Sequence, residues 1–97
     1  MLEKLTESTF FEHVGSTFGV RVDSGDAVKI ELIECKALGR GETAERQPFS
    51  LLFRGAKGLD MPQQIYTMEH ERLGSMEIFI VPVGPVEGGM GFEAVFA

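Results

Sequence analysis

The sequence predicts a mainly all-β fold, in which six antiparallel strands in meander order form a small barrel or curled roll, with a short N-terminal helix. Apolar and polar residues alternate with a period of two over much of the 97-residue chain, which is typical of half-buried strands. Turn sequences rich in Gly, Asp and Pro separate these segments, and no connection is long enough for a helical crossover between parallel strands. Closing the sheet would also remove exposed edges that invite aggregation. We expect a single domain over residues 1–97, since soluble domains most often have about 100–150 residues.

The first segment predicts one or two turns of helix. Thr6 is suited to the N-cap position, and Gly15 is placed to end the helix. Phe10 and Val14 are four residues apart and therefore share one face. Because so short a helix is not stable alone, we expect Phe10, Phe11 and Val14 to dock on the rest of the domain.

A β-hairpin follows the helix. Residues 18–22 and 28–33 each alternate with a period of two, and the turn sequence DSGD lies between them. The second strand continues past Cys35 toward Leu38, a length that requires a bend or a β-bulge. Residues 39–45 are then expected to form an exposed loop.

The second half of the chain supplies the most apolar strands. These strands are expected at residues 49–54, 65–70, 76–83 and 92–97, with loops at residues 55–62, 71–74 and 84–91. In the first of them Phe49, Leu51 and Phe53 alternate, so we expect these three side chains to share a buried face. Leu52 is expected to face the other way.

Charge excludes two classes of partner. The chain has 15 acidic and 9 basic residues, a net charge of −6, and no two basic residues are adjacent. Binding to nucleic acid or to an anionic membrane depends on Lys and Arg, so we expect neither. No apolar run approaches the ~18–20 residues that span a bilayer, and the N-terminus lacks a secretory signal pattern. With Cys35 as the single cysteine, we expect a cytoplasmic protein.

The residue types that carry chemistry are few. A metal site needs three or four convergent ligands, usually including a closely spaced pair, and His13, His70 and Cys35 are far apart in sequence. In a strand Glu69 and Glu71 would point away from His70. Cys35 lies between Glu34 and Lys36, without the electropositive setting of a nucleophilic thiol. We therefore assign no catalytic residue, no metal ligand and no cofactor, and we expect ordinary rim histidines and an inert thiol.

Two glycine-rich loops do not fit nucleotide-binding patterns. Residues 84–91 (GPVEGGMG) are not followed by a helix that would present its N-terminus to a phosphate. Residues 54–58 (RGAKG) bring two cations to a flexible backbone but lack the P-loop spacing. Anion binding at the second loop is an alternative to plain loop geometry.

One end of the barrel is the expected interaction surface. Successive loops of a meander alternate between its two ends, so Ser24-Gly25 and the segments 54–62 and 84–91 should lie together, opposite the loops 39–45 and 71–74. The first end combines cations with apolar loop residues, a composition typical of interface cores. The residues predicted to form this surface are Arg54, Lys57, Leu59, Met61 and Met90.

Several motifs resemble a known family. They are PFSLLFRG, then LxMPQQxYTMEH, LGxMEIFIVPVG and a terminal FEAVF, together with the amino-terminal pattern FxxxxGxxF. They are similar to a family of β-rich bacterial proteins of about this length that carries only a domain-of-unknown-function label. The resemblance covers nearly the whole chain and implies a bacterial or phage-derived origin. It supplies no catalytic residue.

Three classes of function are consistent with these features. The sequence favours a non-enzymatic interaction or assembly module, a structural rather than catalytic protein that binds a protein partner or associates with itself as a homo-oligomer. A small-ligand-binding β-barrel with polar loops at its rim is the first alternative. An enzyme of unknown chemistry is the second.

Overall fold

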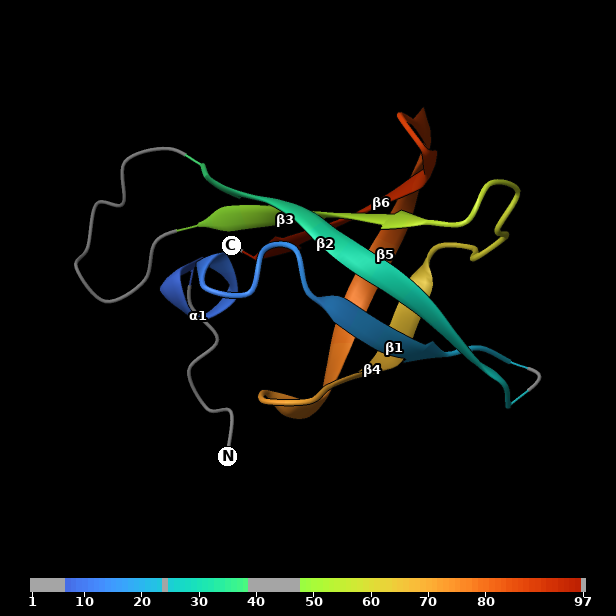
Figure 1. Ribbon diagram of the computed structural model, residues 1–97, viewed down its shortest axis with the longest axis horizontal. Coiled ribbons are helices and arrows are strands. Elements are labelled where there is room, and N and C mark those ends of the chain that lie inside the picture. The colour runs from blue at the N-terminus through green and yellow to red at the C-terminus, as the bar shows by residue number, and fades with distance from the viewer. Residues whose placement is uncertain (1–6, 24, 39–47, 97) are drawn as a thin grey trace.

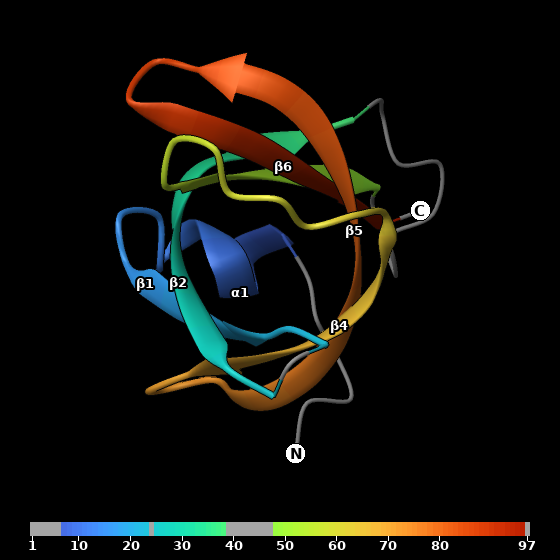
Figure 2. The same ribbon diagram turned by 90° about the vertical axis from the view of Figure 1, so that its right-hand side faces the viewer.

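Six strands close into an antiparallel β-barrel, and one short helix lies at an end of it (Figures 1 and 2). The computed structural model describes residues 7–23, 25–38 and 48–96. The elements are α1 (Glu7–Phe11), β1 (Thr17–Arg21), β2 (Ala27–Ala37), β3 (Phe49–Gly55), β4 (Gln64–His70), β5 (Gly74–Val86) and β6 (Gly89–Phe96). The predicted class is confirmed: a closed, six-stranded antiparallel barrel with a short N-terminal helix. The proposed N-cap Thr6 and the loop 39–45 lie outside the described residues.

The strand order differs from the predicted meander. Around the barrel it is β1-β2-β3-β6-β5-β4, so β3 pairs with β6 and β4 pairs with β1. The strands β1, β2 and β3 are neighbours in sequence order, and so are β4, β5 and β6. The chain then places β4 beside β1 instead of beside β3, which is a Greek-key arrangement. The connection from β3 to β4 crosses the end of the barrel (Figure 2). It is held there because it carries Met61, which is buried in the core, and Leu59, which packs against it.

Two strands bend so that the barrel can close. The bulge predicted in the second strand is confirmed between Leu32 and Glu34. The long strand β5 pairs with β4 up to Ile80 and with β6 from Val81 onward, so it turns from one neighbour to the other. An irregularity between Pro82 and Gly84 accompanies this change.

The loop predicted at residues 84–91 is mostly strand. β5 extends to Val86 and β6 begins at Gly89, which leaves only a tight turn between them. Two of the glycines, Gly89 and Gly91, serve close packing between strands, whereas Gly84 and Gly88 adopt positive φ angles. A Cβ on Gly89 would overlap the carbonyl oxygen of Gly55, and a Cβ on Gly91 would lie 2.7 Å from Cγ1 of Val86.

The barrel interior is a single apolar core. The predicted face of Phe49, Leu51 and Phe53 is confirmed, because all three are buried. Among the residues that the structure describes, the other buried apolar ones are Phe10, Phe18, Val20, Ile30, Leu32, Met61, Tyr66, Met68, Met76, Ile78, Ile80, Phe92 and Ala94. In so small a barrel the side chains fill the interior.

The helix closes one end of the barrel with a single residue. The ring of Phe10 lies 5.6 Å from that of Phe96, 5.9 Å from that of Phe49 and 6.5 Å from that of Phe18, measured between centroids. Phe11 and Val14 remain exposed, so the prediction that they dock was wrong. The helix has only five residues, and just one side of it faces the barrel.

The connections that the structure describes lie at the two ends of the barrel as predicted. Because neighbouring strands are antiparallel, the β1–β2 turn, the β3–β4 connection and the β5–β6 turn lie together at what we term the loop end (Figure 1). Helix α1 and the β4–β5 turn lie at the opposite, helix end.

Candidate functional site

The five residues predicted to form a surface at the loop end have different roles. Met61 is 1% exposed and belongs to the core. Leu59 and Met90 are half-buried and pack against the core. Lys57 is exposed in the loop, and Arg54 is half-buried on β3. The structure thus brings these residues to one end, but uses the three apolar ones mainly for packing.

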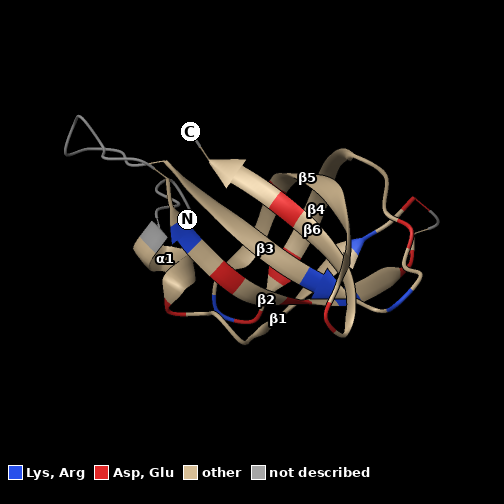
Figure 3. Ribbon diagram, turned by 90° about the horizontal axis from the view of Figure 1, so that it is seen from above, with Lys and Arg blue, Asp and Glu red and all other residues tan. Residues whose placement is uncertain are grey.

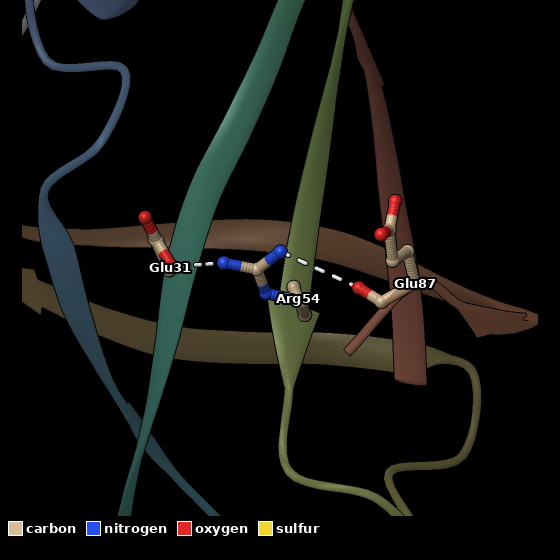
Figure 4. Close-up of polar contacts among 3 residues, drawn as sticks. All are labelled: Glu31, Arg54 and Glu87. Carbon is tan, nitrogen blue, oxygen red and sulfur yellow. Dashed lines mark hydrogen bonds and ion pairs between the residues drawn. The ribbon is translucent and has the colours of Figure 1, made fainter. Parts of the chain in front are cut away.

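Arg54 connects neighbouring segments through polar contacts (Figure 4). Its Nη2 donates to Oε1 of Glu31 on β2 at 2.6 Å, and its Nη1 donates to the carbonyl oxygen of Glu87 in the β5–β6 turn at 3.4 Å. The side chain also lies against Gly88, where an added Cβ would come within 3.5 Å of Cδ of Arg54. Both partners of the ion pair remain partly exposed, so solvent weakens its contribution to stability.

A shallow hollow lies beside this ion pair. It has a volume of about 260 Å³ and is open to solvent. Its lining residues are Thr17, Lys29, Ile30, Glu31, Arg54, Gly55, Ala56 and Gly88. An anion in this hollow would have to compete with the carboxylate of Glu31 for the guanidinium group of Arg54. This arrangement favours a structural role for Arg54.

A polar cluster at the helix end was not predicted from the sequence. His70 is buried at the end of β4, and its ring centroid lies 4.6 Å from that of His13. The backbone N–H groups of Arg72 and Leu73 donate to Nδ1 of His70 at 3.0 and 3.2 Å. The hydroxyl oxygen of Ser16 lies 3.0 Å from Nε2 of the same ring. His70 therefore joins the β4–β5 turn to the segment before β1.

The direction of these hydrogen bonds is opposite to that of a catalytic serine and histidine. Since Nδ1 of His70 accepts two N–H groups, the neutral ring carries its proton on Nε2 and donates it to Ser16. The Ser16 hydroxyl in turn donates to the carbonyl oxygen of His13 at 2.6 Å. The ring cannot accept the hydroxyl proton in this arrangement. The chain of bonds supports the turn and does not activate a nucleophile.

Acid should destabilise the protein through His70. Burial lowers the pKa of His70, and the charge of His13 lowers it further; Glu71 opposes the shift and Arg72 adds to it. The unfolded state then binds the proton more readily than the folded state. The resulting stability is complete above the ordinary histidine pKa of about 6.5 and is lost as the pH falls toward the folded value.

We expect the melting temperature to decline as the pH is lowered from about 7.5 to about 5, around the ordinary histidine pKa. The substitution His70→Gln should lower the melting temperature at pH 7.5 and remove most of this slope. His13→Gln should reduce the slope without abolishing it, because the charge of His13 is only the second cause of the shift. A slope that His70→Gln leaves unchanged would assign the acid sensitivity to other groups.

Among the described residues, neither a metal-ligand cluster nor a membrane-spanning helix is found. No group of three or more His, Cys, Asp or Glu residues among them is placed to hold a metal ion. Cys35 is half-buried on β2. The described part of the chain contains no helix long and apolar enough to cross a membrane.

The outer wall of the barrel carries exposed apolar side chains. Ile65 on β4 and Phe79 on β5 are register partners and are 62% and 48% exposed. Along the same face of β5, Val81 is half-buried and Val83 is 47% exposed. We refer to Ile65, Phe79, Val81 and Val83 as the wall patch. Exposed apolar side chains that cluster in this way are typical of contact surfaces.

The wall patch leaves a trace in the sequence, the apolar run of β5. The run alone does not show which of its residues face the core and which face outward. Residues 76–83 are apolar at nearly every position, a pattern that also favours closure of the sheet. A barrel made of one sheet has only one interior face, however. Met76, Ile78 and Ile80 occupy it, so the alternate apolar residues of β5 must lie outside.

Comparison with known proteins identifies the chain by family alone. No curated protein and no solved structure shows significant similarity to it. A family model matches residues 5–96, nearly the whole sequence. The chain therefore belongs to DUF6916, a domain of unknown function.

Proposed function

We propose that this domain is a non-enzymatic protein-interaction module that binds its partner through the wall patch. The observation that carries the proposal is the exposure of Ile65 and Phe79 side by side on the barrel wall. Burying apolar area contributes about 25 cal/mol per Å², and aromatic residues are enriched at the centres of protein interfaces. A bacterial or phage-derived assembly in the cytoplasm is the setting that we propose with it.

The polar groups of the barrel are consistent with a scaffold. Arg54 is engaged by Glu31 and by the backbone of Glu87. His70 is engaged by the β4–β5 turn and by Ser16. Each of these side chains holds neighbouring segments together, so the groups best suited to catalysis already have a structural use.

The small-ligand alternative has weaker support. Ligand pockets usually measure about 300–1,000 Å³ and enclose most of the ligand. The hollow beside Arg54 has a volume of about 260 Å³ and is open to solvent. The barrel interior is occupied by its own core.

An affinity purification tests the proposed function. We would compare the wild-type domain with the double variant Ile65→Thr/Phe79→Ser, using a lysate of the cells that naturally produce it. Because both side chains are exposed, their removal should leave the melting temperature nearly unchanged. We expect at least one protein to co-purify with the wild type and not with the double variant, and to bind the wild type again when purified.

The control is Phe11→Ser, which removes another aromatic side chain of 62% exposure at the helix end. This variant should retain the same partner. If the set of co-purifying proteins is identical for all three forms, the wall patch is not a binding surface.

A further inference from the structure

The charges of the barrel are divided unequally between its two halves. Within residues 64–96, all of them described, the acidic residues are Glu69, Glu71, Glu77, Glu87 and Glu93. Arg72, in the β4–β5 turn, is the single Lys or Arg in that stretch. The strands β1 to β3 together carry both signs: Lys29, Glu31, Glu34 and Lys36 lie on β2, and the charged residues of β1 and β3 are Arg21 and Arg54. Figure 3 shows both colours along β2, blue at the end of β3 and red on β6. Apart from Arg72, the charged residues in the half of the barrel that carries the wall patch are therefore all acidic.

Two of these carboxylates flank the wall patch. Glu77 is exposed and precedes Phe79 by two positions on β5, so both side chains lie on the outer face. Glu93 on β6 is the register partner of Val81. Glu69, farther along β4, is already paired with Arg21 at 3.5 Å. An apolar surface with acidic residues on two sides is the result.

A second copy of the chain fits this surface poorly. A symmetric contact would pair the wall patch of one copy with the wall patch of the other. Residues 64–96 contain Arg72 as their single Lys or Arg, so the opposed patch would offer Glu77 and Glu93 apolar or acidic groups, and like charges at an interface are unfavourable. The net charge of −6 on each copy adds to the repulsion.

We propose that the partner of the wall patch is a protein segment that presents apolar side chains flanked by Lys or Arg. This inference rests on the proposed function and adds the chemistry of the partner. The apolar residues of the segment would cover Ile65 and Phe79, while its cations would meet Glu77 and Glu93. Such complementarity sets the specificity and the salt dependence of an interaction.

Two matched peptides test the inference. Both have the same alternating Val and Phe positions, and the positions between them are Lys in one peptide and Glu in the other. We expect the Lys peptide to shift the backbone amide NMR signals of Ile65, Phe79 and Val83. Its affinity should fall by about tenfold between about 0.05 and 0.5 M salt, because salt screens charge pairs at the surface. The Glu peptide should produce no comparable shifts.

Two variants separate the contribution of the carboxylates to peptide binding from that of the apolar side chains. Glu77→Gln/Glu93→Gln should weaken the Lys peptide by about threefold to tenfold, as expected for exposed charge pairs. Phe79→Ser should remove the shifts at the wall patch. Equal binding of the Glu peptide, or shifts spread evenly over acidic residues such as Asp23 and Glu34, would overturn the inference.

Sedimentation of the wild-type domain distinguishes failure of the inference from failure of the proposed function. We expect no self-association through the wall patch. If the wild type dimerises and Phe79→Ser is monomeric, the patch is an interaction surface but its partner is a second copy. If Phe79→Ser changes neither peptide binding nor the co-purifying proteins, the proposed function itself is wrong.

Discussion

Replacing Phe53 by alanine is expected to destabilise the protein by about 3–5 kcal/mol, the usual cost of removing a buried phenylalanine. Phe53 is fully buried on β3, where it is the register partner of Leu32 on one side and of Phe92 on the other. Its ring also lies 5.4 Å from that of Phe18 in an edge-to-face arrangement. Because a domain of this size is stable by only about 5–15 kcal/mol, the variant should be largely unfolded or melt at a much lower temperature.

Thermal unfolding followed by circular dichroism measures this effect. Phe11→Ala is the matched control, because Phe11 is exposed at the helix end, and it should change stability by no more than about 0.5 kcal/mol. A Phe53→Ala protein that melts cooperatively at the wild-type temperature would contradict the placement of Phe53 in the core.

Gly89→Ala should have a comparable effect for a different reason. The Cβ that this substitution adds would overlap the carbonyl oxygen of Gly55. That oxygen belongs to the backbone of β3, which is paired with β6 at this point, so it cannot rotate away as a side chain would. We expect a loss of about 3 kcal/mol or more, at the upper end of single-substitution effects.

Gly19→Ala provides the control. Gly19 is also a strand glycine, but a Cβ added there would lie 4.0 Å from its nearest neighbour, the carbonyl oxygen of Glu69. Alanine should be neutral at this position or stabilise by about 0.4–1 kcal/mol, because it reduces the freedom of the unfolded chain. If the two variants have equal midpoints in chemical denaturation, the close approach of Gly89 to Gly55 does not exclude a side chain at position 89.

The sequence predicts local features of this fold better than distant ones. The alternation around Phe49, Leu51 and Phe53, the turn after residue 22 and the bulge in β2 all depend on neighbouring residues, and all are found. The way in which the strands β1–β3 pair with the strands β4–β6 depends on where the β3–β4 connection runs. That path is decided by the packing of Leu59 and Met61 on the core, which alternation within the strands does not encode.

The helix end shows the same limit for polar groups. His13 and His70 are 57 positions apart in sequence, and no spacing rule brings them together. The barrel does so because β4 pairs with β1, the strand that follows the segment of His13. The glycines of residues 84–91 likewise have a composition typical of loops, whereas Gly89 and Gly91 permit close approach between strands.

The measurement that tests the central claim most directly compares two surfaces of the same domain. Titration calorimetry with the purified partner would measure the affinity of Ile65→Thr/Phe79→Ser, on the wall patch, and of Arg54→Gln/Lys57→Gln, at the loop end. Both variants should first be shown to melt cooperatively. We expect the wall-patch variant to lose at least about tenfold in affinity, or about 1.4 kcal/mol, and the loop-end variant to stay within about threefold of the wild type. Full affinity in the wall-patch variant, with binding lost in the loop-end variant, would contradict the account and place the contact around Arg54 and Lys57.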